Sequence, residues 1–373
     1  MMIDLRYPIR DPDAIPSPSL LVFREVVARN LAAMLGMAGG PDRLRPHVKT
    51  HKMPALVRMV EANGVGKHKC ATLAEAEMVA RAGGRDVLIA YPMVGPNVAR
   101  LASLVDRYPE TTFRVAVDDL EAARGLSSAI ERTRRGSLPA LVDLDVGMGR
   151  TGIDPAAAFD LIDRLQTLPG LDFDGLHAYD GHIREQDIEA RRRVARSGLD
   201  TTFALRDRLE GRGIEVRRVV LGGTPTFPIH ATVDEPGVEC SPGTCLLHDA
   251  GYGGKFPDLP FEPAALLLTR VISRPRPGRL CLDLGHKAVA ADPAGPRLTL
   301  LGLPGAALGP QSEEHLVVDA PDTSRFPPGT PLLAIPTHVC PTCALHDFAS
   351  VIDRGEVADR WDVTARGREG TTR

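Results

Sequence analysis

The side chains best suited to chemistry are concentrated in residues 45–52, which read Arg-Pro-His-Val-Lys-Thr-His-Lys. β-Branched residues alternate with polar ones there, and a period of two predicts a short strand over residues 46–50. On that strand Lys49 points to one face and Lys52 to the other. A lysine that points inward is costly to desolvate, so it tends to lose its proton or to form a covalent bond. Lys49 is therefore a candidate for imine chemistry; the alternative is a basic strand at the surface.

A second cluster lies near the C-terminus, in the sequence Pro-Thr-His-Val-Cys-Pro-Thr-Cys-Ala-Leu-His that begins at Pro336. His338 and Cys340 are two residues apart, so an extended backbone puts an imidazole and a thiolate on one side, where they could bind a divalent metal. Cys343 and His346 leave two other interpretations open. The four side chains could enclose a structural zinc ion, or Cys340 and Cys343 could form a redox pair, although a redox pair is expected in a βαβ context.

The elements that would position these residues alternate regularly along the first two thirds of the chain. Strands are predicted at residues 46–50, 67–72, 86–91, 113–118, 140–145, 173–179, 218–221 and 238–247, with helical patterns at 73–82, 98–108, 120–134, 155–165 and 188–212. Strands that alternate with helices predict a parallel sheet. Counted from the lysine strand there are eight, the number that closes a (β/α)8 TIM-type barrel.

The remaining segments predict a second domain. Residues 19–23 form an additional strand candidate before a helical pattern at residues 26–37. Beyond about residue 255 the pattern changes to strands separated by Pro and Gly turns, at residues 264–272, 279–284, 297–301, 315–318 and 331–335. We therefore expect a C-terminal all-β domain, with the boundary near residues 251–260.

Two glycine-rich turns fall where barrels bind phosphate, after the seventh and eighth strands. The first contains Gly222, Gly223 and Thr224, and the second contains Gly243 and Thr244. Glycines let backbone N–H groups approach a phosphate, and threonine hydroxyls add donors. Either turn alone would be read as a simple turn, but their joint position favours a phosphate site.

The composition excludes several classes of protein. A hydrophobic content of 43% with 25% charged residues is that of an ordinary globular protein. A net charge of −3 gives no sign of nucleic-acid binding. We expect neither a signal peptide nor a membrane span, because no long apolar run is present. Six cysteines in a chain of this length suggest reduced thiols and a cytoplasmic location.

The motif Arg-Pro-His-x-Lys-Thr-His-Lys resembles the cofactor-lysine segment of the D-threonine aldolase and D-serine dehydratase family, whose members are pyridoxal-phosphate enzymes with an alanine-racemase-like barrel. The resemblance implies that Lys49 forms the internal aldimine. It also implies a barrel of the alanine racemase N-terminal type over residues 26–255, a β domain over residues 256–373 that carries the metal site, and an N-terminal segment, residues 1–25, that joins the β domain.

Other site residues follow from the same resemblance. Gly-Met-Gly-Arg-x-Gly at residues 147–152 is similar to the pattern in which the arginine, here Arg150, hydrogen-bonds the phenolic oxygen of the cofactor and keeps it ionised. Tyr179 is the tyrosine expected close to the cofactor. His182 could contact the substrate, although a lone loop histidine is as often structural. Pro-x-His-x-Cys makes His338 and Cys340 the ligands of a catalytic Mn²⁺ or Zn²⁺.

The expected activity is that of a lyase acting on D-β-hydroxy amino acids, in a homodimer. A D-threonine aldolase-like cleavage to glycine and an aldehyde comes first, D-serine dehydratase second and an amino-acid racemase third. The aldolase and the dehydratase need the same lysine, cofactor and metal, so the motifs do not separate them. A racemase would lack the His-x-Cys pair.

Overall fold

The computed structural model describes residues 4–303 and 305–369 of the chain. They form two compact units. The barrel unit contains Met34–Lys49, Pro54–Gly243 and the residues from Gly367; the β unit contains the described residues up to Ala33, Thr50–Met53 and Thr244–Arg366. The domain boundaries that the sequence predicted at residues 25 and 255 remain a prediction. In the structure, the chain passes from one compact unit to the other near residues 33 and 244.

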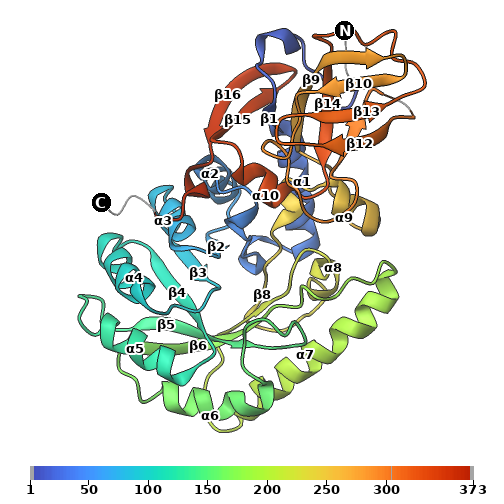
Figure 1. The fold of residues 1–373 in the computed structure, drawn as a ribbon. Coiled ribbons are helices and arrows are strands. Elements are labelled where there is room, and N and C mark those ends of the chain that lie inside the picture. The colour runs from blue at the N-terminus through green and yellow to red at the C-terminus, as the bar shows by residue number, and fades with distance from the viewer. Residues whose placement is uncertain (1–3, 304, 370–373) are drawn as a thin grey trace. The chain divides into compact units, whose positions relative to one another are not determined.

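The barrel unit is built on a parallel sheet with the strand order β2-β3-β4-β5-β6-β7-β8 (Figure 1). The strands are β2 (Lys67–Cys70), β3 (Asp86–Ile89), β4 (Thr112–Val117), β5 (Leu138–Leu144), β6 (Leu171–Ala178), β7 (Arg218–Leu221) and β8 (Val238–Cys240). The predictions for β2 to β7 are confirmed to within two residues at either end. The predicted strand at residues 238–247 is shorter, because Thr244–Leu246 turns into the 3-10 helix η4.

The eighth position of the barrel is filled by a short segment rather than by a strand. Leu44 forms a parallel bridge to Cys240 of β8, and His47 forms one to Lys69 of β2. The segment thus joins both edges of the seven-stranded sheet, which gives the expected barrel. The predicted strand at residues 46–50 is wrong, because the backbone leaves the bridge and enters the 3-10 helix η3 (Val48–Thr50) directly.

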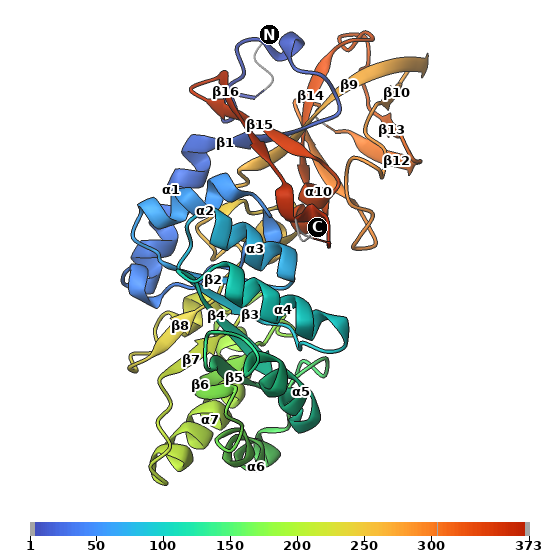
Figure 2. The same ribbon diagram turned by 90° about the vertical axis from the view of Figure 1, so that its left-hand side faces the viewer.

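Helices cover the outside of the barrel sheet, and their first residues explain where they begin. They are α2 (Pro54–Ala62), α3 (Leu73–Arg81), α4 (Pro96–Arg107), α5 (Leu120–Ile130), α6 (Pro155–Leu165), α7 (Ile188–Glu210) and the short α8 (Phe227–His230). The side chains of Thr72, Asp119, Asp154 and Asp187 cap α3, α5, α6 and α7 by accepting a backbone N–H of the first turn. Figure 2 shows α3, α4 and α5 side by side along the sheet.

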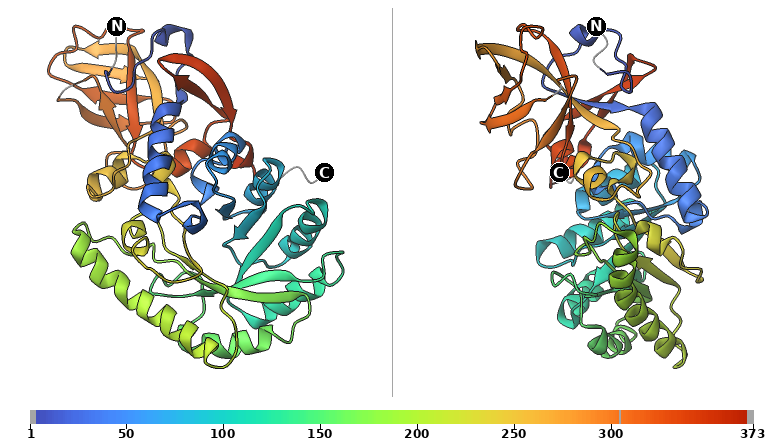
Figure 3. Two further views of the ribbon diagram at one scale, coloured as in Figure 1. Left: turned by 180° about the vertical axis from the view of Figure 1, so that it is seen from behind. Right: turned by 90° about the vertical axis from the view of Figure 1, so that its right-hand side faces the viewer.

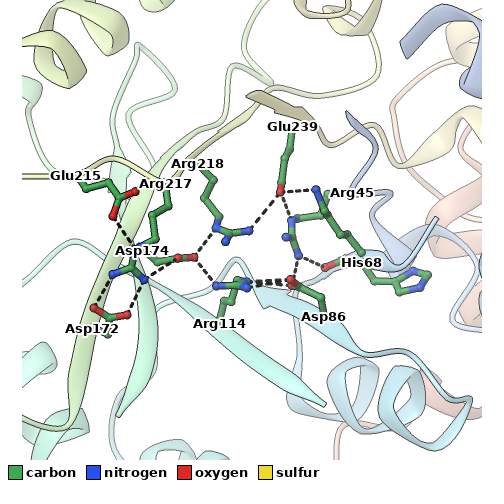
Figure 4. A network of polar contacts seen from close by, with 11 residues as sticks. Arg45, His68, Asp86, Arg114, Asp172, Asp174, Glu215, Arg217, Arg218 and Glu239 are labelled. Atoms are coloured by element: carbon green, nitrogen blue, oxygen red, sulfur yellow. Dashed lines mark hydrogen bonds and ion pairs between the residues drawn. The ribbon is translucent and has the colours of Figure 1, made fainter. Parts of the chain in front are cut away.

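A closed ring of six alternating charges crosses the barrel (Figure 4). Its members come from the closing segment and from five strands: Arg45, Asp86, Arg114, Asp174, Arg218 and Glu239. Arg45 is fully buried, and it donates to Glu239 at 2.5 Å and to Asp86 at 2.6 Å. Burial alone would raise the pKa of Asp86, but Arg45 and Arg114 lower it to about 2. Asp86 is therefore ionised at neutral pH, where it lies between the guanidinium groups of Arg45 and Arg114.

Removing one member of this ring should be costly. Arg45→Met leaves Glu239 and Asp86 short of a partner inside the barrel, and we expect a loss of about 3–5 kcal/mol in the free energy of unfolding. Urea unfolding followed by helical circular dichroism measures it. The matched control is Arg196→Met, because Arg196 pairs with Asp200 on the exposed side of α7; it should cost at most about 1 kcal/mol. Equal effects of the two substitutions would contradict a structural role for the ring.

The β unit is a nine-stranded sheet with the order β12-β13-β10-β9-β1-β15-β16, in which β14 pairs with both β9 and β11 (Figure 3). Its strands are β1 (Ser19–Phe23), β9 (Ala265–Arg276), β10 (Arg279–Leu282), β11 (Leu298–Leu301), β12 (Ala307–Gln311), β13 (Leu316–Asp319), β14 (Pro331–Pro336), β15 (Phe348–Asp353) and β16 (Glu356–Asp362). The N-terminal strand β1 lies between β9, to which it is antiparallel, and β15, to which it is parallel.

The β unit also contains helices that the all-β expectation left out. They are η1 (Pro12–Ala14), α9 (Ala250–Lys255), α10 (Val339–Ala344) and η5 (Thr364–Arg366), while α1 (Arg24–Ala38) runs from this unit into the barrel unit, where η2 (Pro41–Arg43) follows. Within the described part of the chain, no helix is both long and apolar enough to cross a membrane.

Candidate functional site

The ring of Tyr179, which directly follows β6, gathers cationic side chains from three parts of the barrel unit. The Nζ atoms of Lys49 and Lys69 each lie 5.6 Å from the ring centroid, and the guanidinium carbon of Arg150 lies 5.0 Å from it. Arg150 comes from the loop after β5, and Lys69 comes from β2. Three of the predicted site residues, Lys49, Arg150 and Tyr179, are thus brought together.

Two glycines fix the position of this tyrosine. A Cβ atom on Gly181 would lie 2.3 Å from the Tyr179 hydroxyl oxygen, and one on Gly223 would lie 3.2 Å from its Cε2 atom. The phenol therefore packs directly against backbone on both flanks, which only small residues allow. Gly223, which the sequence analysis predicted for the phosphate turn after β7, therefore lies directly against the ring of Tyr179.

Lys49 sits in a 3-10 turn, so the argument from strand parity that separated it from Lys52 does not apply. The two lysines differ for another reason. Lys49 belongs to the barrel unit and reaches Tyr179, whereas Lys52 belongs to the β unit and has a positive φ of 56°. The assignment of the cofactor to Lys49 stays a prediction, and its contact with Tyr179 now supports it.

A buried polar group beside Tyr179 was missed by the sequence reasoning. Lys69 is 1% exposed and donates hydrogen bonds to Ser241 Oγ and, at 3.4 Å, to His177 Nε2. His177 Nδ1 in turn bonds to Asp143 Oδ1 at 2.6 Å. Burial lowers the pKa of His177 despite the nearby carboxylate, so its imidazole is neutral at pH 7. The signal in the sequence was Lys-His-Lys-Cys in a strand, where a lysine at an inward position needs an explanation.

The two predicted phosphate turns lie together. The Gly243 N–H donates to Thr224 Oγ1 at 3.2 Å, which links the turn after β8 to the turn after β7. The Gly222 N–H, however, donates to the Ala178 carbonyl at 2.8 Å, and the Gly223 N–H makes a long bond of 3.4 Å to Thr226 Oγ1. Gly222 is thus held by the barrel itself and does not serve as the predicted phosphate donor.

Gly222 has a steric role instead. Its φ is +62°, and an added Cβ would lie 2.1 Å from the Nδ1 and Cε1 atoms of His230, a buried imidazole that Asp180 holds at 3.1 Å. Neither the backbone conformation nor the space admits a side chain.

Gly222→Ala should therefore lose more stability than a glycine substitution in open space. Gly213 has a similar φ of +78° with nothing near its Cβ position, so Gly213→Ala is the control and should cost about 1–2 kcal/mol. We expect Gly222→Ala to exceed it by about 1–3 kcal/mol, because the imidazole must move. Denaturant unfolding compares the two, and equal losses would show that His230 adapts without cost.

His182 does not join the Tyr179 cluster by any contact that we find. Its Nε2 atom lies 2.8 Å from the position of a Cβ on Gly147, so it packs against the loop that carries Arg150. A role toward the substrate stays a prediction for this residue.

The predicted metal ligands lie at the beginning of a helix, and the prediction of an extended backbone is wrong. His338 is the residue before α10, and Cys340 belongs to its first turn. The two side chains nevertheless interact. A hydrogen bond with Cys340 is the main cause that raises the pKa of His338 to about 9. Asp292 bonds to His338 Nδ1 at 3.0 Å, which leaves Nε2 as the nitrogen for a metal. Asp249 accepts the Val339 N–H at 3.1 Å and so holds the helix start in place.

Cys340 has two hydroxyl neighbours within the β unit. Thr50 Oγ1 lies 3.2 Å and Thr244 Oγ1 lies 3.8 Å from its sulfur atom. Thr244 was predicted for the phosphate turn, but its side chain contacts this thiol. Thr50, the residue after Lys49 in the sequence, was not predicted at all.

Cys343 and His346 face other groups. Cys343 is fully buried, and burial raises the pKa of its thiol far above the usual range. His346 Nε2 bonds to the Ala288 carbonyl at 2.8 Å. In the residues that the structure describes, no three His, Cys, Asp or Glu side chains form a group that could hold a metal ion. The closed four-ligand zinc site is therefore wrong for this arrangement.

Comparison with known proteins agrees with this architecture. The family profile described as "Alanine racemase, N-terminal domain" matches residues 24–249, and that described as "Putative serine dehydratase domain" matches residues 264–352. D-threonine aldolase of Arthrobacter sp. is 34% identical over 370 residues, which cover 96% of this chain and 94% of the relative. The chain belongs to the D-threonine aldolase and D-serine dehydratase family.

Two further members of this family match almost the full chain. The 3-hydroxy-D-aspartate aldolase of Paracoccus denitrificans (strain Pd 1222) is 30% identical, with 97% of this chain and 95% of the relative covered. The crystal structure of D-threonine aldolase from Filomicrobium marinum superimposes with a TM-score of 0.89 at 32% identity, covering 99% of this chain and 100% of the other. The predicted fold class, an alanine-racemase-type barrel with a C-terminal strand-rich unit, is confirmed.

Proposed function

We propose that this chain is a lyase of D-β-hydroxy amino acids that depends on pyridoxal phosphate and a divalent metal, and that it cleaves them in the manner of a D-threonine aldolase. The observation that carries the proposal is the meeting of Lys49 and Arg150 at the ring of Tyr179. A relative named as a D-threonine aldolase and another named as a 3-hydroxy-D-aspartate aldolase, both matching nearly the whole chain, support the aldolase over other lyases.

The residues around Tyr179 fit pyridoxal phosphate. An amine, a guanidinium and an aromatic ring lie together, and the turns that follow β7 and β8 are linked through Thr224 and Gly243. Lys49 would hold the group through its amine, and Arg150 would donate hydrogen bonds to its ionised ring oxygen. Thr224, Gly223 and Gly243 would face its phosphate. When bound, the group supplies an electron sink for negative charge on the α-carbon of the substrate.

His338 and Cys340 fit a divalent metal. The imidazole and the thiol are in contact, and Asp292 orients the imidazole through Nδ1, as carboxylates commonly do at metal-binding histidines. Two protein ligands leave coordination positions for water and substrate. A bound divalent cation supplies the positive charge that makes a β-hydroxyl group more acidic.

The chain's own residues then have distinct tasks. The amine nitrogen of Lys49 would hold the carbonyl carbon of the cofactor, and it would be released with hydrogens from the substrate's amino group when that group takes its place. Arg150 places its guanidinium group beside the ring of Tyr179. His338 and Cys340 would hold the divalent cation through the imidazole nitrogen Nε2 and the sulfur atom.

Product analysis tests the proposal. With pyridoxal phosphate and Mn²⁺ or Zn²⁺ added, D-threonine should give glycine and acetaldehyde, and a chelator should stop the reaction. Lys49→Ala should form neither product, because the residue that holds the cofactor is gone. Formation of 2-oxobutanoate from D-threonine, or of pyruvate from D-serine, with ammonia would instead select the dehydratase, which the match to a serine dehydratase domain keeps as the second candidate. Epimerisation alone would select a racemase.

Variants of the C-terminal motif test the metal. His338→Ala and Cys340→Ala should lower turnover by about a hundredfold or more, because several kcal/mol of transition-state stabilisation are lost. Their melting temperatures should stay close to that of the parent, since His338 is partly exposed. Cys343→Ala and His346→Ala are the matched controls: each loses packing or one hydrogen bond but keeps turnover. Unfolding of all four variants together would show a structural metal and remove the main support for the lyase.

We propose a cytoplasmic location and a homodimer as further properties. The six cysteines are all free thiols, which agrees with a reducing compartment. The homodimer rests on the family resemblance, and sedimentation of the intact chain decides it.

A further inference from the structure

The contact between Asp292 and His338 is too exposed to fix the imidazole by itself. The side chain of Asp292 is 64% exposed and that of His338 is 39% exposed, although the carboxylate and Nδ1 lie 3.0 Å apart. An ion pair in contact with water contributes little, because holding two mobile side chains together costs conformational entropy. The backbone that carries Asp292 must therefore be held elsewhere if Asp292 is to orient the imidazole.

The structure provides this hold in a buried hydroxyl group on α10. Thr342 is fully buried, and its Oγ1 atom accepts the Ala290 N–H at 3.2 Å. The same hydroxyl donates to the His338 carbonyl at 2.7 Å. A hydroxyl carries one hydrogen, so the bond to His338 leaves the oxygen to act as the acceptor toward Ala290. One side chain thus ties the backbone of His338 to the backbone two residues before Asp292.

The bond from Ala290 sets Thr342 apart from an ordinary helical threonine. A threonine in a helix often donates to the carbonyl four residues earlier, as Thr342 does to His338. Ala290, by contrast, lies 52 residues earlier in the chain. His346 adds a bond to the Ala288 carbonyl at 2.8 Å, further from Asp292. Loss of the Thr342 hydroxyl would therefore leave this segment beside α10 and free only the residues next to Asp292.

We propose that Thr342 is a positioning residue for the metal site, because it holds Asp292 where the carboxylate fixes the imidazole of His338 and turns Nε2 toward the cation. Thr342 touches neither the cation nor the substrate and acts through Asp292. The cation is the one proposed above, so the inference rests on the proposed function. The hold of Thr342 on Asp292 needs no metal and can be measured without one.

Zinc binding and crystal structures of the intact protein test this role. The dissociation constant for Zn²⁺ is measured by competition with a chromophoric chelator, and binding that remains in His338→Ala is subtracted. Thr342→Val keeps the shape of the side chain without its hydroxyl, and it should bind Zn²⁺ about tenfold or more weakly. Thr342→Ser restores the hydroxyl and should bind as the parent does. In metal-free crystals, the distance from Asp292 to His338 Nδ1 should stay near 3.0 Å in the parent and in Thr342→Ser, and should exceed hydrogen-bonding length in Thr342→Val.

Two further variants separate positioning from the loss of any buried hydrogen bond. Thr323→Val is the matched control, because Thr323 is also buried in the β unit and accepts the Gly278 N–H at 3.2 Å. It should bind Zn²⁺ as the parent does. Asp292→Ala should weaken binding by about tenfold to a hundredfold. Adding Thr342→Val to Asp292→Ala should weaken it no further, since Thr342 acts through Asp292.

Parent-like zinc binding and an unmoved Asp292 in Thr342→Val would overturn the proposal. So would a double variant whose loss is the product of the two single losses, or an equal loss in Thr323→Val. If Thr342→Val does not fold, Asp292→Ala still decides, because its side chain is exposed and parent-like zinc binding there would remove the residue through which Thr342 acts. A parent protein that binds no Zn²⁺ counts against the proposed function alone, and the metal-free crystal structures then decide the role of Thr342.

Discussion

Closure of the barrel depends on one buried cation. Arg45 lies in the segment that joins β8 to β2, and its guanidinium contacts carboxylates that come from β8 and β3. A segment too short to form a ladder is thus held to both edges by two backbone bridges and two ion pairs. Lys49 follows Arg45 by four residues in the same segment. The ion pairs of Arg45 therefore fix the backbone just before the lysine whose amine lies at the ring of Tyr179.

The fold was predictable wherever periodicity and burial act together. β2 to β7 alternate with capped helices, and their apolar strands are bounded by turns, so local sequence and global fold agree. The failures lie where local chemistry competes. In residues 46–50 apolar and polar side chains alternate as they do in a strand. The backbone nevertheless enters a 3-10 helix directly after the bridge between His47 and Lys69. His338 and Cys340 were expected on extended backbone, but the Asp249 carboxylate accepts the Val339 N–H and starts a helix.

The candidate site was predictable in its residue types and incomplete in its surroundings. Lys49, Arg150 and Tyr179 come from motifs that carry a chemical reason, and they meet. Lys69, His177 and Ser241 have no motif, because they lie on three separate strands or strand ends and become a group only when β2, β6 and the turn after β8 are brought together. The sequence predicted Gly222 as a residue that donates its N–H to a phosphate. In the structure a glycine is needed there because the imidazole of His230 leaves no room for a side chain.

The position of β1 has a consequence for the order in which the chain folds during synthesis. β1 is made first, yet its partners β9 and β15 lie at residues 265–276 and 348–353, so the N-terminal strand must wait until almost the whole protein has left the ribosome. The seven barrel strands are complete by residue 240 and have no such delay. Since domains tend to fold as units as they emerge, the nascent chain should carry a formed barrel and an unpaired apolar strand at its leading end. That exposed edge is the segment on which a chaperone would act.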